Sequence, residues 1–389
     1  MNQTYRGIIT LIRSGLTGES LNLPEKFDLE TAYNEILRHK VFPIVYLGAI
    51  NCGVSKQLPV MKKMFTDYCR AILLNEKQLE AFSLLCMALD KNQLDYLPVK
   101  GCNLKKMYPK PEMRIMGDAD ILIRLEQYDK VAKAMEHLGY TWNNESEYDY
   151  VWDSPALHVE LHKYLFGESE QDFFWYFQNP WDKAEKINGN RYLLNPEDDY
   201  IYIFTHLAKH FRNGGIGCRQ IIDLWVLEKN YNNLDWTYIN QELRKLHLAE
   251  FNLFVRKLLL AWFDDGVWDN RTVHMTDYIF ASGSWGTFES HIISDGAKKA
   301  EKVSSVNGGI VYRVFRMLFP QKSVMSRKYP ILERFSLLLP FMWVYRWVTA
   351  LLFRRRNIQI QKRQLKIVTA ENISSFQEFL EYVGLSFNF

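Results

Sequence analysis

Hydrophobic positions in the N-terminal part of this chain recur with the period of an amphipathic helix. Apolar residues fall three and four positions apart over Leu29–Leu37, directly after Asp28, whose side chain suits a helix N-cap. A longer pattern of the same kind covers Met61–Leu89. The spacing therefore predicts a helical N-terminal region over residues 1–91.

The pattern changes to short, strand-like runs near residue 95. Gln127–Leu138 keeps helical spacing up to Gly139, and another helical stretch begins near Asn103. Three runs have the composition or the alternation of strands: Tyr96–Val99, Ile115–Ile123 and His158–His162. Together these elements predict a small α/β unit over residues 92–195.

The second half of the chain returns to helical spacing. Tyr200–Phe211 and Ile221–Leu227 are predicted helices, separated by the turn-forming Asn213–Gly215. We expect a helical domain over residues 196–306 and a C-terminal region of mixed basic and apolar residues over 307–389. The predicted fold class is therefore α+β, with a small mixed-sheet core and helical N-terminal and C-terminal additions.

The most apolar segment of the chain, Phe335–Phe353, has three interpretations. Its length and the following Arg354–Arg356 are typical of a membrane span. However, Pro340 interrupts the segment, and Arg346 would cost roughly 2.5 to 3.5 kcal/mol at the centre of a bilayer. Its tryptophan and tyrosine side chains with basic neighbours suit a segment lying on a membrane surface. A buried helix, peripheral membrane contact and a span all remain open at this stage.

Composition narrows the class of protein. Hydrophobic residues make up 48% of the chain and charged residues 24%, which is the balance of a packed globular protein. The net charge of +3 is small for 389 residues, so general nucleic-acid binding is not expected. The five cysteines form no Cys-x-x-Cys pair, and the N-terminus lacks the pattern of a secretory signal. We therefore expect reduced thiols and a cytoplasmic protein.

Acidic side chains mark two of the predicted strands. Residues two apart in a strand point to the same side, so Asp118 and Asp120 share one face. The same rule places Glu160 on one face of its strand together with His158 and His162. If the two strands are neighbours, three carboxylates meet, and oxygen ligands of this kind suit Mg²⁺ or Mn²⁺. Such a site favours phosphoryl or nucleotidyl transfer.

Several of these residues together resemble a known family. The resemblance runs from about Leu97 to the segment Ile221–Trp225. It rests on Lys100-Gly101, Arg114, Met116–Ile123 and His158–His162, which are similar to motifs of the bacterial uncharacterised nucleotidyltransferase family of the polymerase beta-like superfamily. This resemblance implies a nucleotidyltransferase core, metal and catalytic roles for Asp118, Asp120 and Glu160, and a nucleoside triphosphate as co-substrate.

The resemblance and the local sequence together indicate a nucleotide-binding set: Lys100, Gly101, Arg114 and Gly117. Lys100 follows a predicted strand, and the arginine fork of Arg114 suits a phosphate, although pairing with Asp118 or Asp120 is an equally good interpretation. Gly117 leaves room for a phosphate or a backbone to approach the strand. The superfamily usually has Gly-Ser or Gly-Gly where this chain has Lys100-Gly101-Cys102.

Four histidines are further candidates as substrate-binding or accessory residues. His158 and His162 flank Glu160 and are expected to orient it, ligate a metal or assist proton transfer, or else to be polar residues of a half-exposed strand. His206 and His210 are four residues apart on a predicted helix, the spacing of a helical zinc pair. Because Leu207 stands where a zinc protease has glutamate, a substrate-facing or structural role is favoured.

These patterns support one leading hypothesis and two alternatives. The leading hypothesis is an enzyme that transfers a nucleoside monophosphate from a triphosphate to a hydroxyl of an unidentified acceptor: a small molecule, a glycan precursor or a protein. The first alternative is a non-catalytic nucleotide-binding or assembly protein, associated with a membrane surface. The second is a hydrolytic zinc enzyme built on the four histidines.

Overall fold

The computed structural model describes residues 2–284, 286–302, 315–316, 318–353 and 369–386. The chain forms two units. The first comprises residues 2–209 and 216–284, and the second comprises residues 210–215 and the described residues from 286 onward. The start of the predicted C-terminal region, residues 307–314, and the Arg354–Arg356 flank lie outside the described residues.

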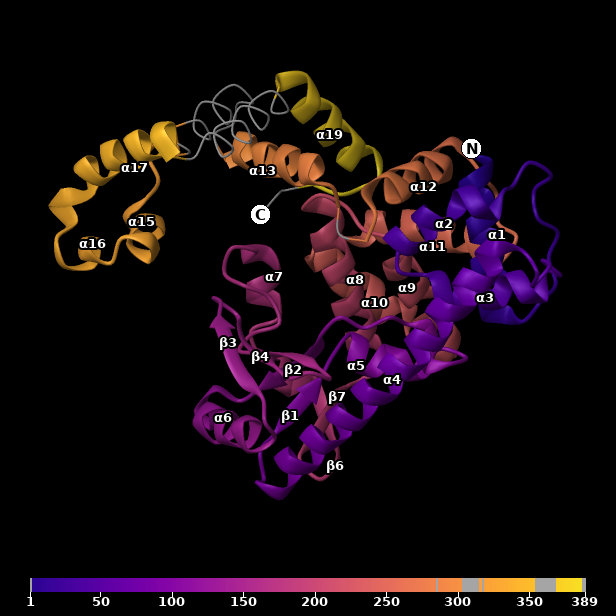
Figure 1. Ribbon diagram of the computed structural model, residues 1–389, viewed down its shortest axis with the longest axis horizontal. Helices are drawn as coiled ribbons and strands as arrows, with labels where there is room; N and C mark the ends of the chain where they lie inside the picture. Colours follow the sequence, from indigo (N-terminus) through magenta and orange to yellow (C-terminus); the bar gives the residue numbers. More distant parts are fainter. Residues whose placement is uncertain (1, 285, 303–314, 317, 354–368, 387–389) are drawn as a thin grey trace. The chain divides into compact units, whose positions relative to one another are not determined.

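The first unit contains a sheet of seven strands (Figure 1). Their order across the sheet is β3-β4-β5-β2-β1-β7-β6, and parallel as well as antiparallel pairs occur. The fold is therefore α+β with a mixed sheet, as predicted. The strands are β1 (Tyr96–Pro98), β2 (Ala119–Ile123), β3 (Thr141–Glu145), β4 (Asp149–Asp153), β5 (His158–His162), β6 (Ala184–Asn188) and β7 (Arg191–Leu194).

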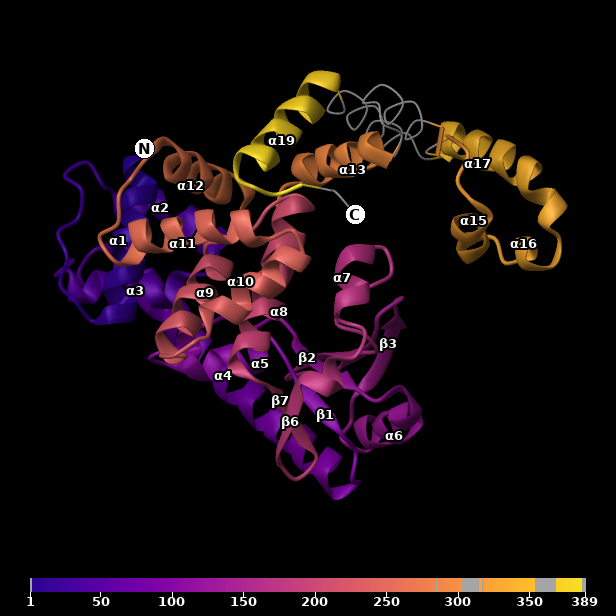
Figure 2. The same ribbon diagram turned by 180° about the vertical axis from the view of Figure 1, so that it is seen from behind.

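The helices of the first unit precede, interrupt and follow the sheet (Figure 2). They are α1 (Gln3–Thr17), α2 (Leu29–Arg38), α3 (Phe42–Asn51), α4 (Pro59–Lys91), α5 (Gly101–Leu104), α6 (Tyr128–His137), α7 (Gln171–Tyr176), α8 (Pro196–Arg212, whose last three residues belong to the second unit), α9 (Cys218–Asn230), α10 (Trp236–Lys245), α11 (Ala249–Phe263) and α12 (Asn270–Ser282).

One face of the sheet carries the core. The residues Ala119, Ile121 and Ile123 of β2 pack there against apolar side chains of α4 and α6. Val159 and Leu161 of β5 belong to the same cluster. Because side chains alternate along a strand, Asp120 and Glu160 point to the opposite face. The predicted division of β2 and β5 into an apolar face and a polar face is confirmed.

Helix α4 links the N-terminal helices to the sheet (Figure 1). Its C-terminal half contributes Phe82, Leu85 and Leu89 to the core beneath the strands. Near the N-terminus, α1 and α3 cross closely: a Cβ added at Gly48 would lie 1.9 Å from the carbonyl oxygen of Leu11. The predicted N-cap is also present, since the Asp28 carboxylate accepts hydrogen bonds from the amides of α2.

The second unit is built from helices in the part of the chain that is described. They are α13 (Phe288–Lys302), α15 (Lys322–Lys328), α16 (Ile331–Arg334), α17 (Leu339–Phe353) and α19 (Ala370–Tyr382). Among the described residues, none of the helices combines the length and the apolar character needed to cross a bilayer.

The structure departs from the predicted strands in two respects. First, β3, β4, β6 and β7 were not predicted and extend the sheet on both sides. Second, β2 begins at Ala119, whereas the predicted strand began at Ile115. The carbonyl of Ile115 accepts a hydrogen bond from Arg219, and that of Met116 accepts one from Gln78. Side chains therefore occupy the backbone carbonyls before β2, which do not pair with another strand. Asp118 lies in this loop, directly before the first residue of β2.

Candidate metal and nucleotide site

The site is created by the parallel pairing of β2 with β5. In this register Asp120 lies beside Glu160, and Leu122 lies beside His162. The side chains of Asp120, Glu160 and His162 converge, with potential ligand atoms within 4.8 Å of one another. Among the described residues this is the group of acids, histidines and cysteines that could hold a metal ion. Asp118, partly exposed, precedes β2 by one residue.

Asp120 is the most constrained of the acids. Its Oδ1 accepts a hydrogen bond from Lys100 Nζ at 2.7 Å and lies 2.9 Å from Nε2 of His162. Burial alone would raise the pKa of Asp120, but Lys100 and His162 hold it well below its usual range. The Asp120 carboxylate is therefore ionised at neutral pH. His162 is buried against the Tyr148 ring, and its Nδ1 has no hydrogen-bond partner.

Glu160 is in a different electrostatic position. Burial raises the pKa of its carboxyl to about 7, and repulsion from Asp120 and Asp118 acts in the same direction. Lys100 opposes these effects only in part. The Glu160 side chain is 25% exposed, so the cluster has an open side. Closely spaced carboxylates with an excess of negative charge fit a hard divalent cation, which takes oxygen ligands from protein, water and phosphate.

Lys100 is held in an uncommon backbone conformation. It follows β1, caps α5 and has φ of +50°, a region that side-chain-bearing residues rarely adopt. Its ammonium group is directed to Asp120. Gly101 next to it is closely packed, because an added Cβ would lie 2.6 Å from Nη1 of Arg114. At Gly117, by contrast, an added Cβ would meet no atom within 4 Å, so the space beside it is open.

Arg114 is buried and bound to an acid that the sequence did not single out as its partner. Its Nε and Nη2 donate to the two carboxylate oxygens of Asp223 at 2.7 and 2.9 Å. Tyr108 also donates to Asp223. The pair connects the loop before β2 to α9. The guanidinium group of Arg114 thus faces Asp223 rather than Asp118 or Asp120.

Two other cations lie beside the acids, and sequence analysis did not identify them as site residues. Lys40 follows α2 in a positive-φ conformation, and Arg219 lies in the first turn of α9. The segment before Lys40 is joined to α9 by His39, whose Nδ1 accepts a hydrogen bond from the amide of Cys218. Ser284, which follows α12, donates to the carbonyl of Arg38. Arg219 in turn donates to Ile115 at 2.9 Å. The two cations therefore flank the loop that carries Asp118.

These cations repel one another. Burial lowers the pKa of Lys40, and the nearby Arg219 lowers it further, while Asp118 opposes the shift. Burial likewise lowers the pKa of Arg219, as does Arg114. No carboxylate lies within salt-bridge distance of Lys40 in the described part of the chain. A cluster of like charges at this position would be stabilised by a bound anion.

The other predicted histidines lie elsewhere. His158 pairs with Asp153 at the other end of β5, and its side chain is 36% exposed. His206 on α8 contacts the rings of Phe166 and Tyr202. His210 belongs to the second unit. Within the described residues, His162 alone of the four belongs to a group with metal-ligand spacing, so the four-histidine zinc site is not formed there.

Comparison with known families agrees with this geometry. A family model described as uncharacterised nucleotidyltransferase matches residues 25–264, more than half of the chain. The matched range includes the sheet, the acids, Lys40 and Arg219. The comparisons with curated proteins and with solved structures gave no match. The match confirms the resemblance to a nucleotidyltransferase family that the motifs indicated.

Cation binding at this site should depend on pH through Glu160. Its pKa of about 7 in the folded chain exceeds the ordinary 4.5, so protonated Glu160 favours folding below about 4.5 and this contribution is lost as pH rises through about 7. A bound cation requires the ionised form, and its affinity should therefore rise with pH. We expect Mg²⁺ or Mn²⁺ to bind about tenfold more tightly at pH 8 than at pH 6, measured by titration calorimetry.

The matched control is Glu160→Gln, which keeps the size of the side chain and removes its titration. This variant should bind the cation weakly at both pH values, with little change between them. Equal affinity of the unaltered protein at pH 6 and pH 8 would contradict a cation ligand role for Glu160.

Proposed function

Because this chain belongs to the uncharacterised nucleotidyltransferase family, we propose that it transfers a nucleoside monophosphate from a triphosphate to a hydroxyl acceptor in a reaction that requires a divalent cation. The observation that carries the proposal is the convergence of Asp120, Glu160 and His162 on the polar face of β2 and β5, with Asp118 at the entrance. This arrangement supplies oxygen ligands where a triphosphate can approach from the open side.

The reaction is a displacement at the α-phosphorus. The acceptor oxygen forms a bond to this phosphorus, the bond to the bridging oxygen of the β-phosphate breaks, and pyrophosphate leaves. Mg²⁺ or Mn²⁺, when held by Asp118, Asp120 and Glu160, would neutralise charge on the phosphates. Ionised Glu160 is also proposed to take up the proton of the acceptor hydroxyl. Lys100 keeps Asp120 ionised and in place.

The triphosphate is proposed to extend from the acids toward Lys40 and Arg219. Both cations flank the Asp118 loop, and Lys40 has no acidic partner at salt-bridge distance among the described residues. Gly117 leaves the adjacent space open. Arg114 contributes indirectly, because its fork is bound to Asp223 and fixes the loop against α9. In this proposal the N-terminal helices contribute a phosphate contact as well as stability.

Loss of the acids should abolish the reaction. Once an acceptor has been found by screening with labelled triphosphates, we expect Asp118→Ala and Asp120→Ala to reduce pyrophosphate release by at least about a hundredfold, because they remove ligands that stabilise charge in the transition state. Glu126→Ala, an exposed acid beyond the far end of β2, is the control and should retain activity. Full activity of either aspartate variant, with unchanged circular dichroism, would refute the assignment.

The non-catalytic alternative makes a different prediction for the same protein. Calorimetry with each triphosphate, with and without Mg²⁺, measures binding independently of turnover. Binding that depends on Asp118 and Asp120, without pyrophosphate release in any acceptor screen, would favour a nucleotide sensor over an enzyme.

Lys40 should affect substrate binding more than the chemical step. A charge-assisted phosphate contact contributes about 1.5 kcal/mol, so we expect Lys40→Ala to raise KM for the triphosphate about tenfold with little change in kcat. Lys56→Ala, an exposed lysine of the same helical region, is the matched control. Steady-state kinetics at fixed Mg²⁺ separates the two parameters. An unchanged KM in Lys40→Ala would place the triphosphate elsewhere.

We also propose that α15–α17 contact a membrane surface. The aromatic rings of Phe319, Trp343 and Trp347 pack together inside this helical segment. In contrast, Leu337 is 91% exposed and Phe341 is 71% exposed. Between residues 315 and 353 the chain has six basic residues and a single acid, Glu333. Exposed apolar side chains among cations fit an anionic lipid surface, which favours peripheral contact over a buried helix.

Liposome flotation tests this contact. The protein should float with vesicles containing phosphatidylserine and float poorly with purely zwitterionic vesicles. Leu337→Glu with Phe341→Glu should abolish flotation, because two charges replace the most exposed apolar side chains of the α15–α17 segment. Leu253→Glu, at an exposed leucine of α11, is the control. Equal flotation of the double variant and the unaltered protein would exclude this surface.

A further inference from the structure

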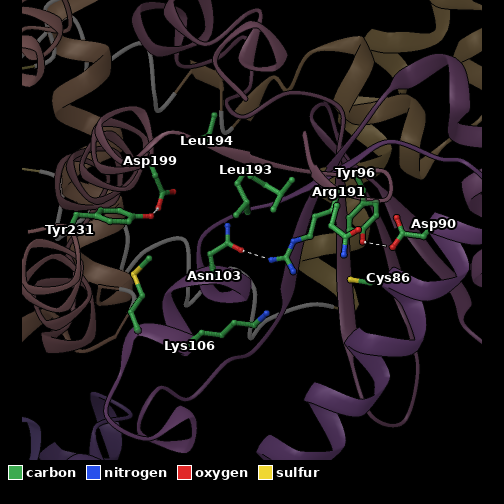
Figure 3. Close-up of a pocket in the computed structure, with 13 residues that line it drawn as sticks. Cys86, Asp90, Tyr96, Asn103, Lys106, Arg191, Leu193, Leu194, Asp199 and Tyr231 are labelled. Atoms are coloured by element: carbon green, nitrogen blue, oxygen red, sulfur yellow. Dashed lines mark hydrogen bonds between the residues drawn. The ribbon is translucent and has the colours of Figure 1, made fainter. Parts of the chain in front are cut away.

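A cavity of the first unit is lined by side chains of α4, the α5 region, the β6–β7 hairpin, α8 and the C-cap of α9 (Figure 3). Tyr96 pairs with Ile123 on one side and with Arg191 on the other, so Arg191 points to the same face as the apolar core. Asp120 and Glu160 point to the opposite face. The cavity, between α4, the α5 region and the β6–β7 hairpin, is therefore distinct from the proposed metal site.

Its volume suits a small molecule. The cavity has a volume of about 590 Å³, within the range of about 300 to 1,000 Å³ typical of ligand pockets. Apolar side chains form part of the wall, among them Met107, Ile187 and Leu193. Such a wall would cover the hydrocarbon body of a ligand.

Two cations on the cavity wall lack acidic partners. Arg191 donates from Nη2 to Asn103 at 3.1 Å, while its buried Nε has no hydrogen-bond partner. Figure 3 shows Arg191 and Asn103 extending toward one another, with Lys106 on the neighbouring segment. Neither Arg191 nor Lys106 forms a salt bridge with a described residue. A buried arginine nitrogen without an acceptor is costly, and a bound anion would satisfy it.

The acids of the cavity accept hydrogen bonds from neutral donors. Asp90 accepts hydrogen bonds from Tyr96 and from the amide of Asn190. Asp199 accepts one from Tyr231, and burial raises its pKa to about 6. Neither carboxylate forms a salt bridge with Arg191 or Lys106 within the described residues, so both cations remain available to a ligand. The cavity keeps a positive side at Arg191 and Lys106, next to apolar walls.

We propose that this cavity binds a small organic anion, whose phosphate or carboxylate group contacts Arg191 and Lys106 and whose apolar body packs against Met107, Ile187 and Leu193. Asn103, which also accepts from Arg191, orients the guanidinium toward the ligand. Asn103 lies on α5, which begins directly after Lys100. A ligand in the cavity would therefore contact α5, the short helix that begins next to Lys100 of the proposed nucleotide site.

Cys86 provides a local probe, because its partly exposed thiol lines the cavity. Burial raises its pKa, so alkylation by iodoacetamide is followed at mildly alkaline pH by peptide mass spectrometry. Cys52, on the N-terminal helices, is the internal reference. The probes are phenyl phosphate, benzoate and the neutral benzyl alcohol, without divalent cations. Either anion at saturation should slow alkylation of Cys86 roughly fivefold or more relative to Cys52.

The relative effect of phenyl phosphate and benzoate identifies the preferred anionic group. Arg191→Gln and the exposed Lys106→Gln should each remove most of the protection, whereas Lys110→Gln, an exposed lysine outside the cavity, should retain it. Circular dichroism checks the fold of each variant. Three outcomes would overturn the proposal: no protection by either anion, equal protection by benzyl alcohol, or full protection in Lys106→Gln. None of these depends on transferase activity.

Discussion

The parallel pairing of β2 with β5 is the constraint on which the site depends. It sets Asp120 beside Glu160 on the polar face, while Ala119 and Val159 are fixed in the core. A shift of the register by one residue would turn the acids into the apolar core and the apolar side chains outward. The cost of burying carboxylates without partners excludes that alternative. Core packing therefore determines the geometry of the acids.

Burial also leaves the charges of the site unbalanced. Lys100 neutralises Asp120, and Glu160 is left with two acidic neighbours and a raised pKa. On the other side of the Asp118 loop, Lys40 and Arg219 repel each other. Negative charge at the acids and positive charge at Lys40 and Arg219 thus lie next to one another, and Asp118 offsets the repulsion between the two cations only in part. A divalent cation and a polyphosphate would bring opposite charge to each group, which explains why the two should bind together.

Local pattern predicted the part of this site that lies within single strands. Alternation in His158–His162 and around Asp120 was sufficient to predict which side chains share a face, because this depends only on the period of a strand. Two of the additional strands, β3 and β6, were missed because β3 is exposed throughout and β6 largely so, and they therefore lack an apolar stripe that would mark them. The N-cap at Asp28 was predictable because it is a local hydrogen bond.

Long-range contacts explain what the sequence could not provide. Lys40 lies near the acids because the preceding residue, His39, accepts a hydrogen bond from the amide of Cys218, which is 179 positions away from His39 in the sequence. No local pattern encodes such a contact. Arg114 shows the converse: its motif position was compatible with phosphate binding or with pairing to Asp118 or Asp120, but Asp223, 109 positions away, occupies both arms of its fork. The partner supplied by the fold thus decides whether a cation is structural or available to a ligand, and residue type alone does not.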